Sequence, residues 1–362
     1  MSSLFTFILF LIVFIPIALI QTCMPILTRR TESFGVAIPA EQFHNPTLKQ
    51  MRKTYATGSL ILAIVALVLM LLTRNWMPAF PILLLAYLVS SFFVYYYFHR
   101  KMKAFKAEQN WYIEKKQAVT VDTSFRSQKL TYSNGWFVIG LCLSVATIIF
   151  SFAVYDKIPS RIPMKFALDG TATRWADKNV RTLLYIPIIQ LYLLGLFIFV
   201  NVMIGRAKAV IDPDAPEASA QRNAIFRRRW SAFMITMGTL LILMMGLTQV
   251  SMLFNVHPEV MGVLHIIFVV IVIMGTIILS FTTGQGGSRI KLPAKTDVTL
   301  VNRNDDRYWK LGVFYFNKED PALFVEKRFG IGWTNNFAHP LSWLIIIGFI
   351  VIIILIGWFL GD

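Results

Sequence analysis

The chain has 362 residues, 56% of them hydrophobic, and a formal net charge of +16. A mean hydropathy of +0.61 and apolar runs of about twenty residues exclude an ordinary soluble protein, because such runs match the thickness of a bilayer core. Backbone groups find no water in hydrocarbon, so helices are the expected spanning elements. The sequence predicts an all-α polytopic protein of the cell membrane with about eight transmembrane helices. The predicted spans are residues 4–20, 55–72, 77–98, 136–154, 183–204, 230–254, 260–281 and 341–360.

The positive charge is distributed unevenly among the predicted loops. With the N-terminus outside, the loops after the first, third, fifth and seventh spans hold 28 of the 35 lysines and arginines. This positive-inside pattern predicts that both termini lie outside and that these four loops are cytoplasmic. Anionic lipid of the inner leaflet then accounts for the net charge. No direct nucleic-acid partner is predicted.

Residues 1–134 are expected to form a three-helix membrane region with basic cytoplasmic loops. Asn45 can cap a helix and Pro46 suits a first helical turn, so a helix is predicted to run from Pro46 unbroken into the second span. The run FFVYYYFHRKMK, residues 92–103, places aromatic residues before cations, which is typical of an anchor at the membrane interface. Residues 111–125 are predicted to hold a short helix and a strand.

Residues 135–204 are predicted to be a two-helix unit with a polar extracellular loop at residues 155–182. Pro159 and Pro163 fix φ and remove two backbone donors, so the loop is expected to be extended. An Asp-Gly pair supplies its tight turn. Trp175 is expected at the bilayer edge, with Lys178 facing water. The candidate residues of this loop are Pro159, Pro163, Lys165, Gly170, Trp175 and Lys178.

Residues 205–287 are predicted to comprise a cytoplasmic loop and a helix pair. The run RNAIFRRRW, residues 222–230, is expected to extend the sixth span as a helix. Its three arginines are expected to meet lipid phosphates, with a partner protein as the alternative. The run TTGQGGSR, residues 282–289, is interpreted as a helix-ending turn. A phosphate-binding loop is the alternative, although the P-loop pattern is absent.

Residues 288–340 form the largest predicted cytoplasmic segment, and residues 341–362 hold the last transmembrane helix. YWKLGVFYFN, residues 308–317, alternates like a strand, and ALFVEKRFGIG, residues 322–332, is a second predicted strand after a turn. This pattern predicts a small β-hairpin module. Its candidate inner contact surface consists of Phe314, Tyr315, Asp320, Arg328 and Trp333.

Catalytic patterns are absent from the sequence. The predicted spans contain no Asp, Glu, Lys or Arg, which lowers the expectation of a coupled transporter. H-E-x-x-H, G-x-S-x-G and paired membrane carboxylates are also missing. The sequence therefore predicts no enzyme, no cofactor and no metal site. The remaining intramembrane polar residues, expected to join helices by hydrogen bonds, are Gln190, Asn201, Gln249 and His265, the last with proton sensing or ligand binding as an alternative.

Three segments carry a family resemblance. IPSRIPMKFALDGTATRWADK, residues 158–178, resembles the outer loop of the bacterial sporulation-delaying-protein immunity family, in which two Ile-Pro steps, a glycine and Trp-x-x-Lys recur. That family usually has a histidine two residues after the second proline, where this chain has Lys165. FGVAIP, residues 34–39, and the stretch 309–337 resemble uncharacterised Firmicutes-type membrane proteins, the latter being similar to a C-terminal module of unknown function. The resemblance implies protection from a membrane-active peptide and tethering of a transcriptional repressor.

These features support three hypotheses. The first is a non-enzymatic immunity, stress-response or sensor protein, whose outer loop meets an extracellular peptide or envelope component and whose module contacts a cytoplasmic regulator. The second is a permease or channel-like component for a small or lipid substrate, with the four intramembrane polar residues lining its path. The third is a scaffold whose cations organise anionic lipid, so that lysine would replace the arginines of 227–229 without loss.

Overall fold

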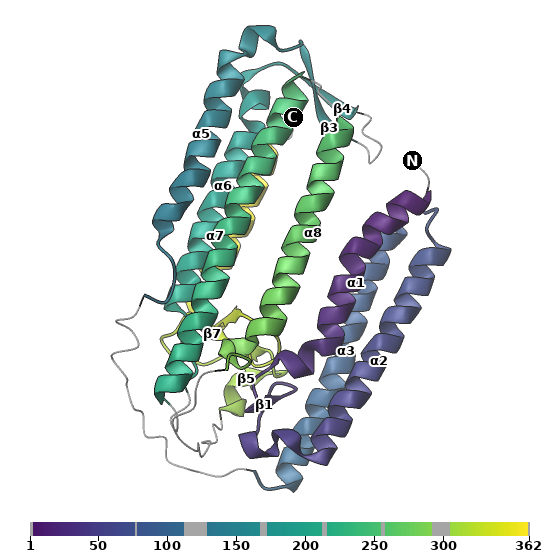
Figure 1. Ribbon diagram of the computed structural model, residues 1–362, viewed down its shortest axis with the longest axis vertical. Coiled ribbons are helices and arrows are strands. Elements are labelled where there is room, and N and C mark those ends of the chain that lie inside the picture. Colours follow the sequence, from purple (N-terminus) through teal and green to yellow (C-terminus); the bar gives the residue numbers. More distant parts are fainter. Residues whose placement is uncertain are drawn as a thin grey trace.

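The computed structural model describes residues 3–76, 78–111, 129–166, 172–211, 216–254, 258–291 and 305–360. Eight of the described helices are long and apolar enough to cross a membrane, which confirms the predicted number of spans. They stand side by side as a tall bundle (Figure 1). These helices are α1 (Ser3–Leu27), α2 (Pro46–Leu72), α3 (Ala79–Glu108), α5 (Val138–Ala153), α6 (Val180–Arg206), α7 (Pro216–Phe254), α8 (Pro258–Thr283) and α9 (Pro340–Leu360).

The bundle consists of two helix groups with α8 between them. Helices α1, α2 and α3 pack against one another, and α5, α6 and α7 form a second group with α9 against α6. Helix α8 contacts both α7 and α1. Figure 1 shows both chain ends at the same end of the bundle as strands β3 and β4, which is called the hairpin face below. The opposite end, which carries β1, β5 and β7, is called the module face.

Local sequence signals explain where several helices begin and end. The Asn45 side chain accepts a hydrogen bond of 2.9 Å from the Thr47 N–H, and α2 then runs unbroken from Pro46, as predicted. Helix α7 includes the whole of RNAIFRRRW, which confirms the predicted extension of the sixth span. Helix α3 continues to Glu108, ten residues beyond the predicted end of its span. Its last three turns therefore reach the strands of the module face.

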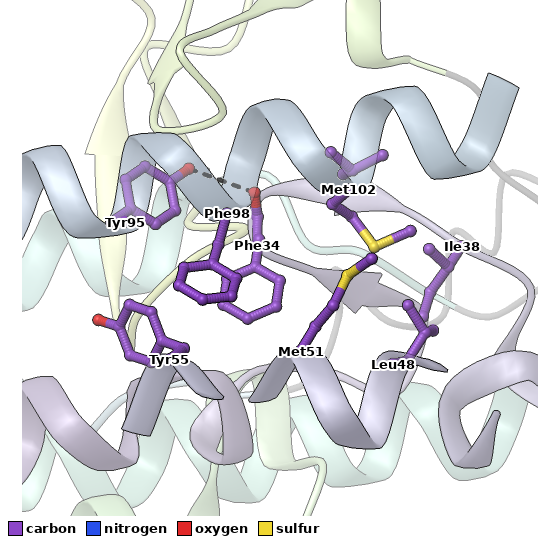
Figure 2. Close-up of a cluster of buried hydrophobic side chains, with 9 residues drawn as sticks. Phe34, Ile38, Leu48, Met51, Tyr55, Tyr95, Phe98 and Met102 are labelled. Atoms are coloured by element: carbon purple, nitrogen blue, oxygen red, sulfur yellow. Dashed lines mark hydrogen bonds between the residues drawn. The ribbon is translucent and has the colours of Figure 1, made fainter. Parts of the chain in front are cut away.

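The aromatic residues near the end of α3, where an interfacial anchor is predicted, lie in two environments, and Phe93 and Tyr97 are 63% and 62% exposed. Tyr95 and Phe98 are 3% and 5% exposed, because they pack against Phe34 from the FGVAIP segment. Phe34 forms a turn with Gly35 between β1 (Glu32–Ser33) and β2 (Val36–Ala37), with φ of 49° and 75° at the two residues. Figure 2 shows the Phe34 ring among the rings of Phe98, Tyr55 and Tyr95. The cluster comprises Phe34, Val36, Ile38, Leu48, Met51, Tyr55, Tyr95, Phe98 and Met102.

The C-terminal module, residues 305–339, contains two hairpins where the sequence predicted one. Strand β5 (Trp309–Lys310) pairs with β6 (Phe314–Tyr315), and β7 (Phe324–Glu326) pairs with β8 (Trp333–Asn335). The predicted first strand is broken at Leu311 and Gly312, whose φ values of 53° and 73° form a tight turn. A Cβ atom at Gly312 would collide with Tyr95 and His99 of α3. The turn is therefore determined by its contact with α3. The alternation of apolar and polar residues along 308–317 could not predict that contact.

The polar loop between α5 and α6 is a β-hairpin. Strand β3 (Arg161–Phe166) pairs antiparallel with β4 (Ala172–Asp177), in agreement with the predicted extended conformation. Its tip, including Gly170, lies outside the described residues, as do residues 112–128, where a short helix and a strand were predicted.

Candidate functional site

The module is attached to the bundle through buried ion pairs, and Glu326 is central to them. This residue is 1% exposed on β7. One carboxylate oxygen pairs with Arg29, two residues after α1, and the other lies 3.3 Å from Nη2 of Arg227 on α7. Asn223 donates to the same carboxylate at 2.6 Å. One module side chain thus joins α1 of the first helix group to α7 of the second.

Arg227 shows why a guanidinium is needed at this position. Its side chain is completely buried. Its nitrogens donate to the carbonyls of Ile204 and Ala207 at 2.7 and 2.8 Å, where α6 ends, and to Asn223 Oδ1 at 2.6 Å. Carbonyls at a helix C-terminus lack intrahelical donors, and a planar fork reaches several of them at once. Arg227 is therefore a structural cation inside the protein, which corrects the prediction that all three arginines meet lipid phosphates.

A second ion-pair cluster joins the module to α3 and to the FGVAIP segment. Arg328 is 3% exposed and pairs with Asp305 and Asp306. Asp306 also lies 2.7 Å from Nζ of Lys106 on α3 and accepts a 3.0 Å hydrogen bond from the Ala37 N–H. Phe329, the next residue along the chain, places its ring 4.3 Å from that of Tyr95. Two of the segments that carry the family resemblance thus meet at this cluster.

The third ionic link joins Asp320 of the module to Lys208, two residues after the end of α6. The Asp320 carboxylate accepts hydrogen bonds from Lys208 Nζ at 2.6 Å, from Tyr315 Oη at 2.7 Å and from the Ala322 N–H at 3.0 Å. Burial alone would raise the pKa of this carboxyl, but the three hydrogen bonds and the Lys208 charge outweigh burial and lower the pKa below its usual value. Asp320 is therefore held as an anion, and through Lys208 it anchors the segment that follows α6.

The glycine-rich turn after α8 also holds the module. Gln285 is fully buried. Its Nε2 donates to the carbonyls of Lys327 and Gly332 at 3.0 and 2.9 Å, and its Oε1 accepts from the Gly332 N–H at 2.7 Å. Several backbone N–H groups of the turn donate within the turn itself. These contacts confirm the predicted helix-ending turn, in which the N–H groups of Gly287, Ser288 and Arg289 donate to backbone carbonyls.

The five predicted contact residues of the module lie mostly inside the chain. Tyr315, Asp320 and Arg328 are buried, and the Trp333 ring packs 5.0 Å from that of Phe226 on α7. Phe314 is 43% exposed and is the one predicted contact residue with a large exposed apolar surface. Most of the predicted surface is therefore an interface between the module and the helices.

The β3–β4 hairpin is built on the opposite face. Ile158 and Ile162 are buried against Leu183 of α6 and Leu253 of α7. The Trp175 side chain lies opposite Pro163 in the strand register and is 48% exposed. Pro163 is buried, whereas Pro159 is exposed, and Lys165 lies within β3. The hairpin thus presents an aromatic side chain from a base fixed on two helices.

Lys178 departs from the prediction that it faces water. Its ammonium donates to the carbonyls of Tyr155 and Ile158, both at 3.2 Å, and lies 4.7 Å above the Tyr155 ring. These contacts tie the end of β4 to the end of α5. Lys178 therefore closes the base of the hairpin.

The four intramembrane polar residues contact separate partners. Gln190 donates to the Ile242 carbonyl at 2.9 Å, and Gln249 donates to the Leu183 carbonyl at 3.0 Å. Asn201 donates to Asn134 at 2.7 Å and accepts from Ser231 at 2.6 Å. His265 Nε2 lies 3.2 Å from Thr248 Oγ1, between α8 and α7. None of the four lines the open groove between α7 and α8 that Arg229 and Phe233 border, and their contacts are those of helix packing.

Sequence reasoning missed Arg29, Lys106, Lys208, Arg227 and Glu326 as members of one layer. It assigned the cations to lipid because the positive-inside pattern accounts for charge without partners. One signal was available in the sequence, namely the carboxylates of the module, which form ion pairs with all four of these cations. Their pairing across 99 or more residues of sequence is a property of the tertiary structure.

Eight apolar helices, each long enough to cross a bilayer, define a multi-pass membrane protein. Two family models match parts of the chain: a domain of unknown function, DUF1648, over residues 142–191, and a family of unknown function, DUF5808, over residues 318–343. The first covers most of α5, the hairpin and the beginning of α6. The second covers β7, β8 and the start of α9. No curated protein and no solved structure matches the chain.

Proposed function

We propose that the protein is a non-enzymatic membrane receptor of the immunity or sensor kind. In this proposal the β3–β4 hairpin binds an extracellular amphipathic peptide or envelope component, and the module communicates with a cytoplasmic regulator. The observation that carries the proposal is the Trp175 side chain, 48% exposed on a hairpin whose base is fixed. Exposed aromatic side chains on rigid supports bind amphipathic partners with little loss of conformational entropy.

The two faces are connected by the same helices, which supports signalling in addition to binding. Helix α6 supplies Leu183 beneath the hairpin, and Lys208, two residues beyond its other end, pairs with Asp320 of the module. Helix α7 supplies Leu253 beneath the hairpin and Arg227 against Glu326. A ligand that shifts the hairpin would therefore act on both module contacts through continuous helices.

The test is survival of a susceptible Gram-positive host that expresses the full chain. Wild type, empty vector and Trp175→Ala are compared over a titration of membrane-active peptides at matched membrane abundance. Trp76→Ala is the control, because Trp76 is 59% exposed in the α2–α3 turn on the same face. We expect wild type and Trp76→Ala to protect and Trp175→Ala to lose protection. Equal losses in both variants, or no protection by wild type, would contradict the proposal.

The module half of the proposal is tested separately on the full-length protein. Phe314→Ser removes the exposed apolar side chain of the module, and Lys310→Ser, at an exposed neighbouring position, is the control. We expect Phe314→Ser to reduce capture of a cytoplasmic regulator while peptide protection at the outer face is unchanged. Unchanged capture would remove Phe314 from the partner contact.

The permease hypothesis has no comparable support. Its four polar residues contact helix backbones and neighbouring side chains: Gln190 and Gln249 join α6 to α7, Asn201 bonds to Asn134, and His265 joins α8 to α7. Such bonds between helices specify packing.

A further inference from the structure

The groove between α7 and α8 combines an apolar floor with a cation at one end. It has a volume of about 490 Å³ and is open along its length to the surroundings of the bundle. The Arg229 side chain is exposed at the end nearer the module face, where its Nη1 donates to Thr283 Oγ1 at 3.3 Å. The groove is lined by Arg229, Ala232, Phe233, Gly275, Ile278, Leu279 and Thr282.

The groove extends into the apolar part of the bundle. The α8 residues that line it run from Gly275 to Thr282, which is about 10 Å of helix at 1.5 Å per residue. At the deep end Gly275 lies against the Phe233 ring, so that a Cβ atom there would press into the ring. The apolar window of α8 has a mean hydropathy of 2.9 and none of its residues is buried within the chain. The surrounding hydrocarbon therefore has direct access to the groove.

The three consecutive arginines have different surroundings. Arg227 is buried against Glu326. The Arg228 guanidinium lies 6.0 Å above the Tyr132 ring. Arg229 alone of the three lines the groove. A cation at the membrane interface favours a negatively charged headgroup, and an adjoining apolar groove favours an acyl chain.

We infer that the α7–α8 groove is a binding site for one anionic phospholipid, whose headgroup phosphate pairs with Arg229 and whose acyl chain lies along Phe233 and Ile278. A guanidinium suits this role because it presents several donors to phosphate oxygens. The carbonyl of Phe281, near the end of α8, is already paired with Arg289 at 3.1 Å. That contact reduces the negative charge that the helix end would otherwise present to the phosphate.

The experiment uses the purified full-length protein in a neutral detergent. Phosphatidylglycerol and phosphatidylcholine with the same acyl chains are titrated separately, and bound lipid is counted by native mass spectrometry together with the shift in Tm. We expect phosphatidylglycerol to bind more tightly and to raise Tm further. Inorganic phosphate at equal concentration is expected to leave Tm unchanged, because it has no acyl chain. A full effect from phosphate alone would overturn the lipid site in favour of a free-anion site.

Four variants locate the site. Arg229→Gln is expected to weaken phosphatidylglycerol binding roughly fivefold, the effect of one basic residue beside an anionic headgroup, whereas Arg229→Lys should retain most of it. Arg228→Gln removes the same charge one residue away and should bind as wild type. Ala232→Phe fills the groove with Arg229 intact and should also lose the lipid. Equal losses from Arg228→Gln and Arg229→Gln would overturn the assignment in favour of general surface charge.

A second copy of the chain is the competing occupant. It would appear as a dimer mass that Ala232→Phe abolishes and that lipid does not affect, and this result would also overturn the proposal. Peptide protection is not part of any readout here, so failure of the lipid site leaves the receptor proposal intact.

Discussion

The hairpin face and the module face use charged residues in opposite ways. On the hairpin face, Arg161 and Asp177 pair at 3.7 Å with side chains 74% and 84% exposed, and such pairs contribute little to stability. On the module face, Glu326 and Arg227 are both fully buried at their side chains, and loss of one partner would leave the other charge without compensation. The hairpin is therefore a local structure whose surface ion pair adds little stability, whereas the module joins distant segments of the chain through buried ion pairs.

The largest expected effect is at Glu326. Glu326→Gln removes the carboxylate that pairs with buried Arg227 and leaves Arg29 with the more distant Glu32 at 3.6 Å, and removal of one partner from a buried pair costs about 3–5 kcal/mol. We expect a large fall in Tm and in the yield of monodisperse protein, measured by fluorescence-detected size exclusion after heating. Glu319→Gln, at an exposed position of the same module, is the control and should behave as wild type. If both variants were equally stable, the ion-pair layer would not hold the module.

The second effect separates a buried structural cation from an exposed one. Arg227→Lys keeps the charge but cannot reach Asn223, the α6 carbonyls and Glu326 together, so we expect a loss of about 2–3 kcal/mol. Arg228→Lys should be within about 0.5 kcal/mol of wild type, as is usual at the surface. The measurement is thermal unfolding of both variants in one detergent. Equal stability of the two would favour the scaffold hypothesis, in which charge alone is sufficient.

The third effect is a pH dependence that belongs to the module face. The folded pKa of Asp320 is lowered, so its contribution is present above the unfolded value of about 3.9 and is lost as pH falls through the lower folded value. Asp320→Asn should therefore lower Tm at neutral pH and reduce the fall in Tm on acidification. An Asp177→Asn variant is the control, because that carboxylate is largely exposed on the hairpin. The same acid profile in wild type and Asp320→Asn would contradict the assignment.

The smallest effect is at the base of the hairpin. Lys178→Gln loses the donations to Tyr155 and Ile158, and we expect about 1 kcal/mol of local destabilisation. Hydrogen exchange should rise in residues 155–178 and stay unchanged in the module, because local opening need not involve the whole bundle. Lys157→Gln, at an exposed position, is the control. Equal exchange in the module and the hairpin would show that the two faces are not independent.

The class of protein and the local course of the chain could be predicted from the sequence. Eight apolar runs predicted eight spans because the cost of exposing backbone in hydrocarbon acts on each segment separately. Asn45 and Pro46 predicted the start of α2, and Pro159 and Pro163 predicted an extended loop, because capping and a fixed φ are also local. The polar side chains within the spans were expected to join helices, because amides in hydrocarbon hydrogen-bond to neighbouring helices.

The roles of the charges and of the strands in the module depend on contacts between segments that are distant in the sequence. Lys106 and Asp306 are 200 residues apart in the sequence, and Arg29 and Glu326 are further apart still. Gly312 breaks a predicted strand because Tyr95 and His99 leave no space for a Cβ atom. Ion pairing and close packing depend on which segments meet in space, and a local sequence pattern does not specify which distant segment a residue will contact. The same reason explains why three neighbouring arginines, alike in the sequence, have three different environments in the folded protein.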